Sequence, residues 1–155
     1  MRERIPAARV DTPAVAAVFL KAHGTGAQPL PDHWLQHGSS LLDPGITAFP
    51  RRPRMAPGDH LILYASGWRR IFGIAEVLTE PATKVPSPAN PVRWPWSVAV
   101  ELLLIVPLLE NAPPVEAIGV SPRSMSQQSH IRLEPRHLEL AAEALSGLAE
   151  RALRG

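Results

Sequence analysis

The chain of 155 residues contains no cysteine. A disulfide framework, a thiolate metal site and a cysteine nucleophile are therefore excluded, and the composition suits a cytoplasmic protein. Long apolar runs are also missing. The longest, residues 98–109, is interrupted by Glu101 and Pro107 and is too short to cross a membrane. Asp11 and Pro13 likewise interrupt the apolar core that a signal peptide requires.

The common motifs of nucleotide-dependent and hydrolytic enzymes are absent as well: there is no P-loop, no GxSxG and no dinucleotide-binding fingerprint. Glu76 and Glu101 lie on predicted strands, where salt bridges with arginine explain them more simply than acid–base catalysis. His33 and His37 have the spacing of a metal pair on a helix, but no third ligand follows at metal-like spacing, and solvent-facing side chains are the simpler interpretation. We therefore predict neither a metal nor a cofactor.

Net charge is low, at +2 from 16 basic and 14 acidic residues, and does not by itself indicate a nucleic-acid-binding protein. The distribution is more informative. Acidic residues gather toward the C-terminal third, whereas arginines surround the loops of the first two thirds, at Arg51, Arg52, Arg54, Arg69, Arg70 and Arg93. This asymmetry permits a basic face for phosphate groups, although arginine used only as a solubilising cation explains it equally well.

The length fits one domain, which we place at residues 14–155 after a loosely ordered leader at residues 1–13. The 18 prolines lie mainly in connections, which predicts stiff loops, notably residues 41–55 and 79–95. Apolar runs predict strands at 14–21, 59–66, 70–79, 96–106 and 123–133, helical turns at 31–38 and 113–118, and a helix at 135–153. In that helix Leu138, Leu145 and Leu148 belong to one apolar stripe, which we expect to pack on the barrel.

The centre of the chain predicts a β-hairpin. Pro57-Gly58-Asp59 is a turn sequence, and two apolar runs of strand length follow it, separated by residues 66–70. The loop between them carries Trp68, Arg69 and Arg70, side chains that are costly to expose unless something stacks or pairs with them. This tip is predicted to form one wall of a binding site; the alternative is that Trp68 folds back as a core plug.

About five non-local strands with short helices predict an α+β fold built as a small mixed barrel, because closure removes exposed sheet edges. The hairpin sequence adds a resemblance. Pro57-Gly58-Asp59, the strand ending Tyr64-Ala65-Ser66 and the run at residues 72–77 are similar to the centre of the EVE domain family of the PUA-like superfold. Arg93-Trp94-Pro95-Trp96 and residues 124–133 follow in the family's order.

The resemblance spans roughly residues 14–140 and is strongest at about 57–78. The Trp-x-Gly-Val-Arg-Asn type of motif that EVE members carry is missing between Trp34 and Pro57. No role is therefore transferred to Trp34, and the related ASCH and YTH-like branches of the superfold stay open.

The family resemblance implies a PUA-like barrel whose pocket holds a nucleobase, often a modified one, between aromatic walls. Aromatic rings stack on any base, and short polar groups read its edge. The candidate base-binding residues are Tyr64, Ser66, Trp68, Trp94, Trp96, Ser126, Gln127 and Gln128. Arginines hold phosphates, and the candidates for this role are Arg69, Arg70, Arg93 and Arg123. Core packing of the tryptophans and a solvated loop at Gln127 and Gln128 are the alternatives.

The sequence thus predicts a nucleic-acid-binding module whose partner is either DNA or RNA. No membrane partner is expected, and the sequence does not indicate the oligomeric state. An enzyme of the ASCH-like type, acting on nucleotides or RNA through His60 or His130 with arginines, is a second interpretation. A protein-interaction module that uses the loops rich in tryptophan and proline is a third. An enzyme requires a titratable group that converges on the pocket, whereas a binding module requires only aromatic and hydrogen-bonding groups.

Overall fold

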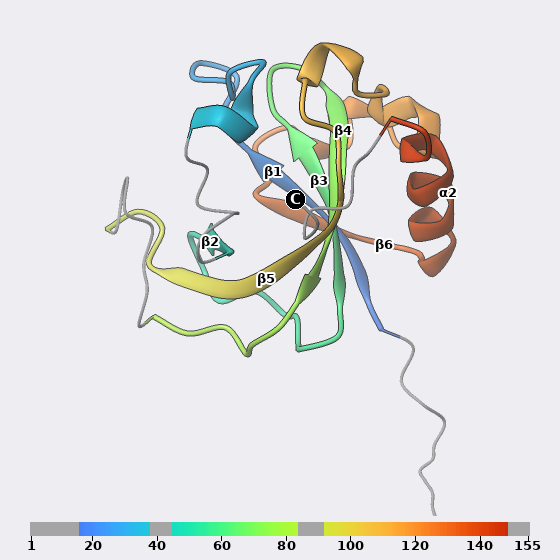
Figure 1. The fold of residues 1–155 in the computed structure, drawn as a ribbon. Coiled ribbons are helices and arrows are strands. Elements are labelled where there is room, and N and C mark those ends of the chain that lie inside the picture. Colours follow the sequence, from blue (N-terminus) through green and yellow to red (C-terminus); the bar gives the residue numbers. More distant parts are fainter. Residues whose placement is uncertain (1–15, 38–44, 84–91, 149–155) are drawn as a thin grey trace, which may run out of the picture.

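The computed structural model describes residues 16–37, 45–83 and 92–148. Six strands form one mixed sheet in the order β2-β5-β4-β3-β1-β6 (Figure 1). Their bounds are β1 (Val18–His23), β2 (Ile46–Phe49), β3 (His60–Ala65), β4 (Arg70–Val77), β5 (Trp96–Ile105) and β6 (His130–Leu133). Short 3₁₀ turns connect them, namely η1 (Trp34–His37), η2 (Leu109–Asn111), η3 (Val115–Ile118) and η4 (Pro122–Met125), and helix α2 (Pro135–Leu145) follows β6.

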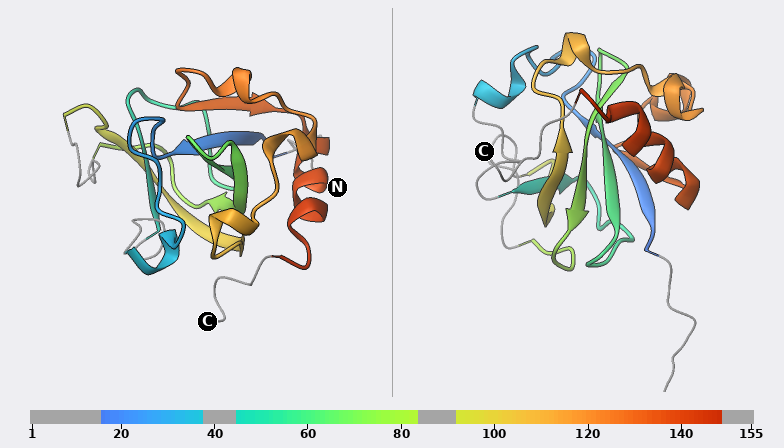
Figure 2. Two further views of the ribbon diagram at one scale, coloured as in Figure 1. Left: turned by 90° about the horizontal axis from the view of Figure 1, so that it is seen from above. Right: turned by 45° about the vertical axis from the view of Figure 1, so that its right-hand side comes forward.

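The sheet curls into a half-barrel, so the predicted α+β, PUA-like barrel with short helices and a C-terminal helix is confirmed (Figure 2). Register shifts between Leu63 and Tyr64 and between Ile74 and Ala75 bend strands β3 and β4, as β-bulges do. The two edge strands lie close to one another: the centre of the Phe49 ring, at the end of β2, is 5.1 Å from the centre of the His130 ring, at the start of β6. Helix α2 packs on the sheet, against β1, β3, β4 and β5.

The central hairpin is confirmed, with β3 and β4 paired antiparallel from His60 opposite Glu76 to Ala65 opposite Arg70. Asp59 fixes the turn before it: one carboxylate oxygen accepts from the Ala17 amide and the other from the Ala56 amide, both at 2.9 Å. Gly58 adopts φ 96°, which a side chain disfavours. The turn sequence therefore also holds the start of β1 beside the start of β3.

Two predictions of secondary structure were wrong. The connection predicted at residues 41–55 contains β2, which pairs antiparallel with β5; four residues between proline-rich flanks carry too weak a local signal, and the partner strand supplies the ladder. The strand predicted at residues 123–133 begins only at His130. Pro122 and the Ser121 side chain, which accepts from the Arg123 amide, start turn η4 instead.

The predicted ends of the first strand and the last helix also shift. Strand β1 runs from Val18 to His23, and residues 14–15, like the leader expected at 1–13, lie outside the described residues. Helix α2 ends at Leu145 because Gly147 adopts φ 83°, a left-handed conformation that stops a helix. Leu145 is fully buried and Leu138 packs against the core, but Leu148 lies beyond the helix end and is exposed. Residues 149–153 lie outside the described part of the chain.

Candidate nucleic-acid interface

A cleft of about 1190 Å³ opens where β1 and β3 end. It is lined by the turn after β1, Pro50 after β2, the end of β3 with the hairpin tip, the segment before β5, and η4 with the loop that leads to β6. Most of the predicted site residues line this cleft. The base-binding candidates among them are Tyr64, Ser66, Trp94, Ser126, Gln127 and Gln128, and the phosphate-binding candidates are Arg69, Arg93 and Arg123.

Strand direction explains why these distant segments meet. Strands β1 and β3 are parallel, with Ala22 opposite Tyr64, so both end at the same rim. Strand β6 is antiparallel to β1, so its beginning lies at that rim too, and the Ala22 amide donates to the Ser129 carbonyl at 2.9 Å. On the other side the Ser66 amide donates to the His23 carbonyl at 3.0 Å. The end of β1 is therefore hydrogen-bonded to Ser66 on one side and to Ser129 on the other.

Two residues of the cleft hold unusual backbone conformations. Arg69 (φ 58°) and Gln127 (φ 60°) are the non-glycine residues with positive φ in the part of the chain that the structure describes. The Arg69 amide donates to the Ala65 carbonyl at 2.9 Å, and its own carbonyl accepts from Val115 at 3.0 Å, so the hairpin and η3 maintain this conformation. Left-handed conformations of non-glycine residues are disfavoured and cluster at functional sites.

Trp94 supplies the indole of the cleft, and a buried ammonium lies against it. Lys21 Nζ is 5.5 Å from the centre of the Trp94 ring and 4.9 Å from that of Phe49, and it donates to the Ala22 carbonyl at 2.8 Å. Only 3% of Lys21 is exposed. Burial lowers the pKa of Lys21 from 10.5 to about 7.

Two histidines share this buried environment. Burial first, and the Lys21 charge second, lower the pKa of His23 well below 6.5 and also lower the pKa of His130. His23 Nε2 is buried without a hydrogen-bond partner among the described residues, whereas His130 Nδ1 lies 2.8 Å from Ser129 Oγ. Sequence reasoning missed this basic cluster. Its signal was the alternation along β1, which places Phe19, Lys21 and His23 on one face of the strand.

Three predicted site residues do not line the cleft. Trp68 is half-buried against the core, and its Nε1 donates to the Leu30 carbonyl at 2.8 Å, which matches the core-plug alternative. The Arg70 guanidinium donates to the carbonyls of Leu109, Glu110 and Ala112 and thereby fastens η2 to the hairpin. Trp96 begins β5 opposite Phe49, and its ring lies 5.3 Å from the Arg52 guanidinium.

Trp34 belongs to the core and not to the cleft. It is 1% exposed, its Nε1 donates to the Val106 carbonyl at 2.9 Å, and its ring meets Phe72 edge-on at 4.9 Å. The His33 ring lies 3.9 Å from Asp32, while the side chain of His37 is outside the described part. Within residues 16–37, 45–83 and 92–148, no group of three or more histidines and carboxylates is placed to hold a metal ion.

The lining of the cleft is aromatic, amide, hydroxyl and guanidinium in character. Among the described residues that line it there is neither a histidine nor a carboxylate. Burial raises the pKa of the Tyr64 hydroxyl, and the Arg69 charge opposes that effect. These groups can stack on a planar ring, donate and accept hydrogen bonds along its edge, and neutralise phosphate. No helix in the described segments is long and apolar enough to span a membrane.

No model of a known protein family matches the sequence, and no curated protein is similar to it. Solved structures do share the fold. The YTH domain of a Zygosaccharomyces rouxii protein, in complex with N6-methyladenosine RNA, superposes with a TM-score of 0.55 at 10% identity, over 90% of this chain and 92% of that one.

Two structural-genomics targets are similar as well. The crystal structure of an Agrobacterium tumefaciens protein gives a TM-score of 0.54 at 16% identity, over 83% of this chain and 93% of that one. The solution structure of a Rhodopseudomonas palustris protein gives a TM-score of 0.50 at 16% identity, over 83% of this chain and 92% of that one. At these identities the likeness shows a shared fold and nothing more.

Proposed function

We propose that this chain is a nucleic-acid-binding module of the EVE-like type, whose cleft holds one base of a strand. The observation that supports it is the convergence on one cleft of predicted residues from three segments distant in sequence, at residues 64–69, 93–94 and 123–128. The lining combines two aromatic rings with hydrogen-bonding and cationic side chains, the groups that bind a base and its phosphates.

Each part of the lining then has a physical role. The Trp94 indole stacks on the base, and stacking tolerates every base because each has a π-face. Gln127 and Gln128 present side-chain amides, which pair in bidentate fashion with an adenine-type edge, and Ser66 adds a short hydroxyl. Arg69 and Arg123 neutralise the phosphates on either side, a contact that fixes position but carries no base information.

The fold and the lining favour binding over catalysis. The YTH domain with the same fold is in complex with RNA that carries N6-methyladenosine, so a barrel of this shape is compatible with holding a modified base. His60 and His130, the residues an RNA-acting enzyme would use, do not line the cleft. A binding module needs no titratable group there.

Replacing Trp94 tests the proposal. We expect Trp94→Ala to weaken oligonucleotide binding by about 1–3 kcal/mol, the range measured for base–aromatic stacking. Trp94→Phe keeps a π-face and should bind more tightly than the alanine variant. Binding is measured by fluorescence anisotropy of labelled oligonucleotides, with and without modified bases, and folding by circular dichroism. A folded Trp94→Ala variant that binds as the parent does would refute the stacking role.

A further inference from the structure

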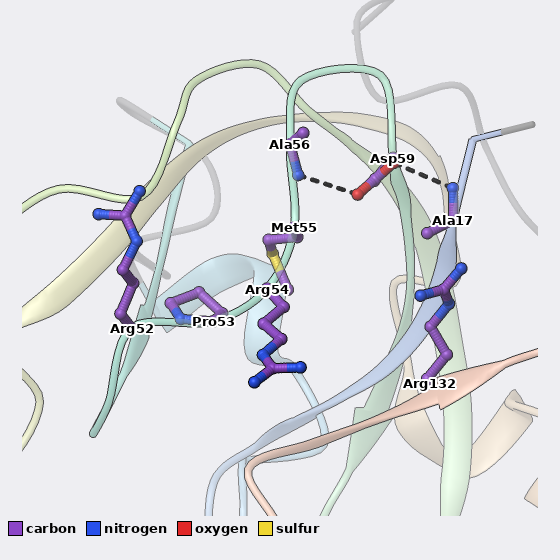
Figure 3. A pocket seen from close by; sticks show the side chains of 8 residues that line it. All are labelled: Ala17, Arg52, Pro53, Arg54, Met55, Ala56, Asp59 and Arg132. Carbon is purple, nitrogen blue, oxygen red and sulfur yellow. Dashed lines mark hydrogen bonds between the residues drawn. The ribbon is translucent and has the colours of Figure 1, made fainter. Parts of the chain in front are cut away.

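A second depression, of about 520 Å³, lies at the opposite end of β1 (Figure 3). Arg52 and Arg54 of the segment between β2 and β3 line it together with Arg132 of β6. Its floor includes the buried side chain of Met55. None of these arginines lines the cleft, so the proposed base site leaves this group of three unexplained.

Aromatic rings and a carbonyl, not carboxylates, position two of the three guanidiniums. Arg52 lies 5.3 Å from the centre of the Trp96 ring and donates to the Pro81 carbonyl at 3.5 Å. Arg132 lies 5.7 Å from the centre of the Phe19 ring. No ion pair or hydrogen bond of Arg54 is found in the described part of the chain. A guanidinium stacked on a ring keeps its N–H edge available for bidentate binding of an oxyanion.

The one carboxylate that lines the depression is already engaged. Asp59 Oδ1 accepts from the Ala17 amide and Oδ2 from the Ala56 amide, so it holds the turn and is oriented toward the backbone (Figure 3). The lining thus holds three guanidiniums and one carboxylate, whose oxygens have backbone donors. This excess of positive charge, on three exposed residues, suits an anion with several oxygens.

The depression and the cleft lie close together along the chain. Ser129 lines the cleft, and Arg132, three residues later, lines the depression. Likewise Pro50 lines the cleft, and Arg52, two residues later, lines the depression. From Ala17, the residue before β1, to Ala22 the chain spans about 17 Å, at roughly 3.3 Å per residue. In a stacked strand with one phosphate per 3.4 Å, that distance corresponds to about five nucleotides, and to fewer where the strand is extended.

We infer that Arg52, Arg54 and Arg132 bind phosphates of the same nucleic-acid strand whose base occupies the cleft, a few nucleotides away. This inference rests on the proposed function and extends it, because it makes the partner a strand of several nucleotides and not a free nucleoside. The strand runs beside β6, between the cleft and the arginine depression. The contact is electrostatic and independent of base sequence.

Two arginine-to-glutamine variants, each of which removes one positive charge, test the inference. Arg54→Gln removes a guanidinium from the depression, and Arg136→Gln removes one from α2, where Arg136 pairs with Glu134. Binding of an oligonucleotide of about ten nucleotides, long enough to cover both sites, is measured by anisotropy over a range of salt concentrations. Arg54→Gln should lower the slope of log K against log salt by about 0.7, the value for one phosphate of a single strand, and Arg136→Gln should leave it unchanged.

A length series separates this inference from the proposed function. The triple variant Arg52→Gln/Arg54→Gln/Arg132→Gln should bind a mononucleotide as the parent does and lose affinity only for the longer strand, whereas Trp94→Ala should lose affinity for both. If the triple variant matches Arg136→Gln on the long strand while Trp94→Ala still weakens binding, the arginine site is refuted and the base site stands. If only the triple variant has an effect, the base site is refuted. Equal, arginine-dependent binding of oligoglutamate or of vesicles with anionic lipid would refute nucleic acid as the partner of the depression.

Discussion

Replacing Lys21 by methionine is expected to remove a rise in stability that the parent protein shows between about pH 7 and pH 10. Burial lowers the pKa of Lys21 from 10.5 to about 7. Across this interval the unfolded chain carries a proton on Lys21 that the folded chain releases, so the free energy of unfolding increases with pH. At 1.36 kcal/mol per pKa unit, the full effect is about 5 kcal/mol.

Below about pH 7 the ammonium stays buried in the folded protein, where the Ala22 carbonyl and the rings of Phe49 and Trp94 are its partners. Lys21→Met should therefore be more stable than the parent at pH 6 and should lose that advantage as pH rises. Urea unfolding at a series of pH values up to about 9.5 measures this, with Lys21→Gln as the uncharged polar control. The lowered pKa values of His23 and His130 add a loss of stability in acid, below 6.5; both variants retain the part that burial causes and lose the smaller part that the Lys21 charge causes. A parent whose stability is flat from pH 7 to 9.5 would contradict the prediction.

Shortening Leu145 is expected to destabilise the protein by about 2–5 kcal/mol, the usual cost of truncating a fully buried leucine. Leu145 is 0% exposed at the end of α2, packed on the sheet. Leu148 is the matched control: it is the same residue one turn later in the sequence, but 45% exposed beyond the helix end. Leu148→Ala should cost less than about 1 kcal/mol, as surface substitutions do. Equal losses in urea unfolding would mean that α2 extends past Gly147.

In the proposed complex, the cleft and the arginine depression at the two ends of β1 have different roles. The cleft would supply the hydrogen-bonding groups that give specificity, and the depression would supply charge that raises affinity for any sequence. Lys21 lies behind the cleft, because its ammonium is buried against the Trp94 ring. A change in its protonation alters the field at the proposed stacking surface.

Features whose causes are local could be predicted from the sequence. The hairpin is the clearest, because Pro57-Gly58-Asp59 specifies the turn and the two apolar runs have lengths that pair. The grouping of site residues at one end of the barrel could be predicted in part, because residues that follow or precede strands come together at the end of a small barrel. Strand β2 could not, because its four residues become a strand only through the ladder that β5 provides.

The sequence by itself determined the central hairpin, the α+β class and the chemical types of the candidate site residues. Only the tertiary structure decided which tryptophan faces the cleft. Trp68 and Trp94 both stand in loops beside arginines, yet the Trp68 N–H bonds the Leu30 carbonyl, 38 residues away, whereas Trp94 lies over Lys21 at the cleft. A half-buried indole needs a hydrogen-bond acceptor and a packing surface, and distant segments supply both. Local sequence patterns do not specify which distant segment that is.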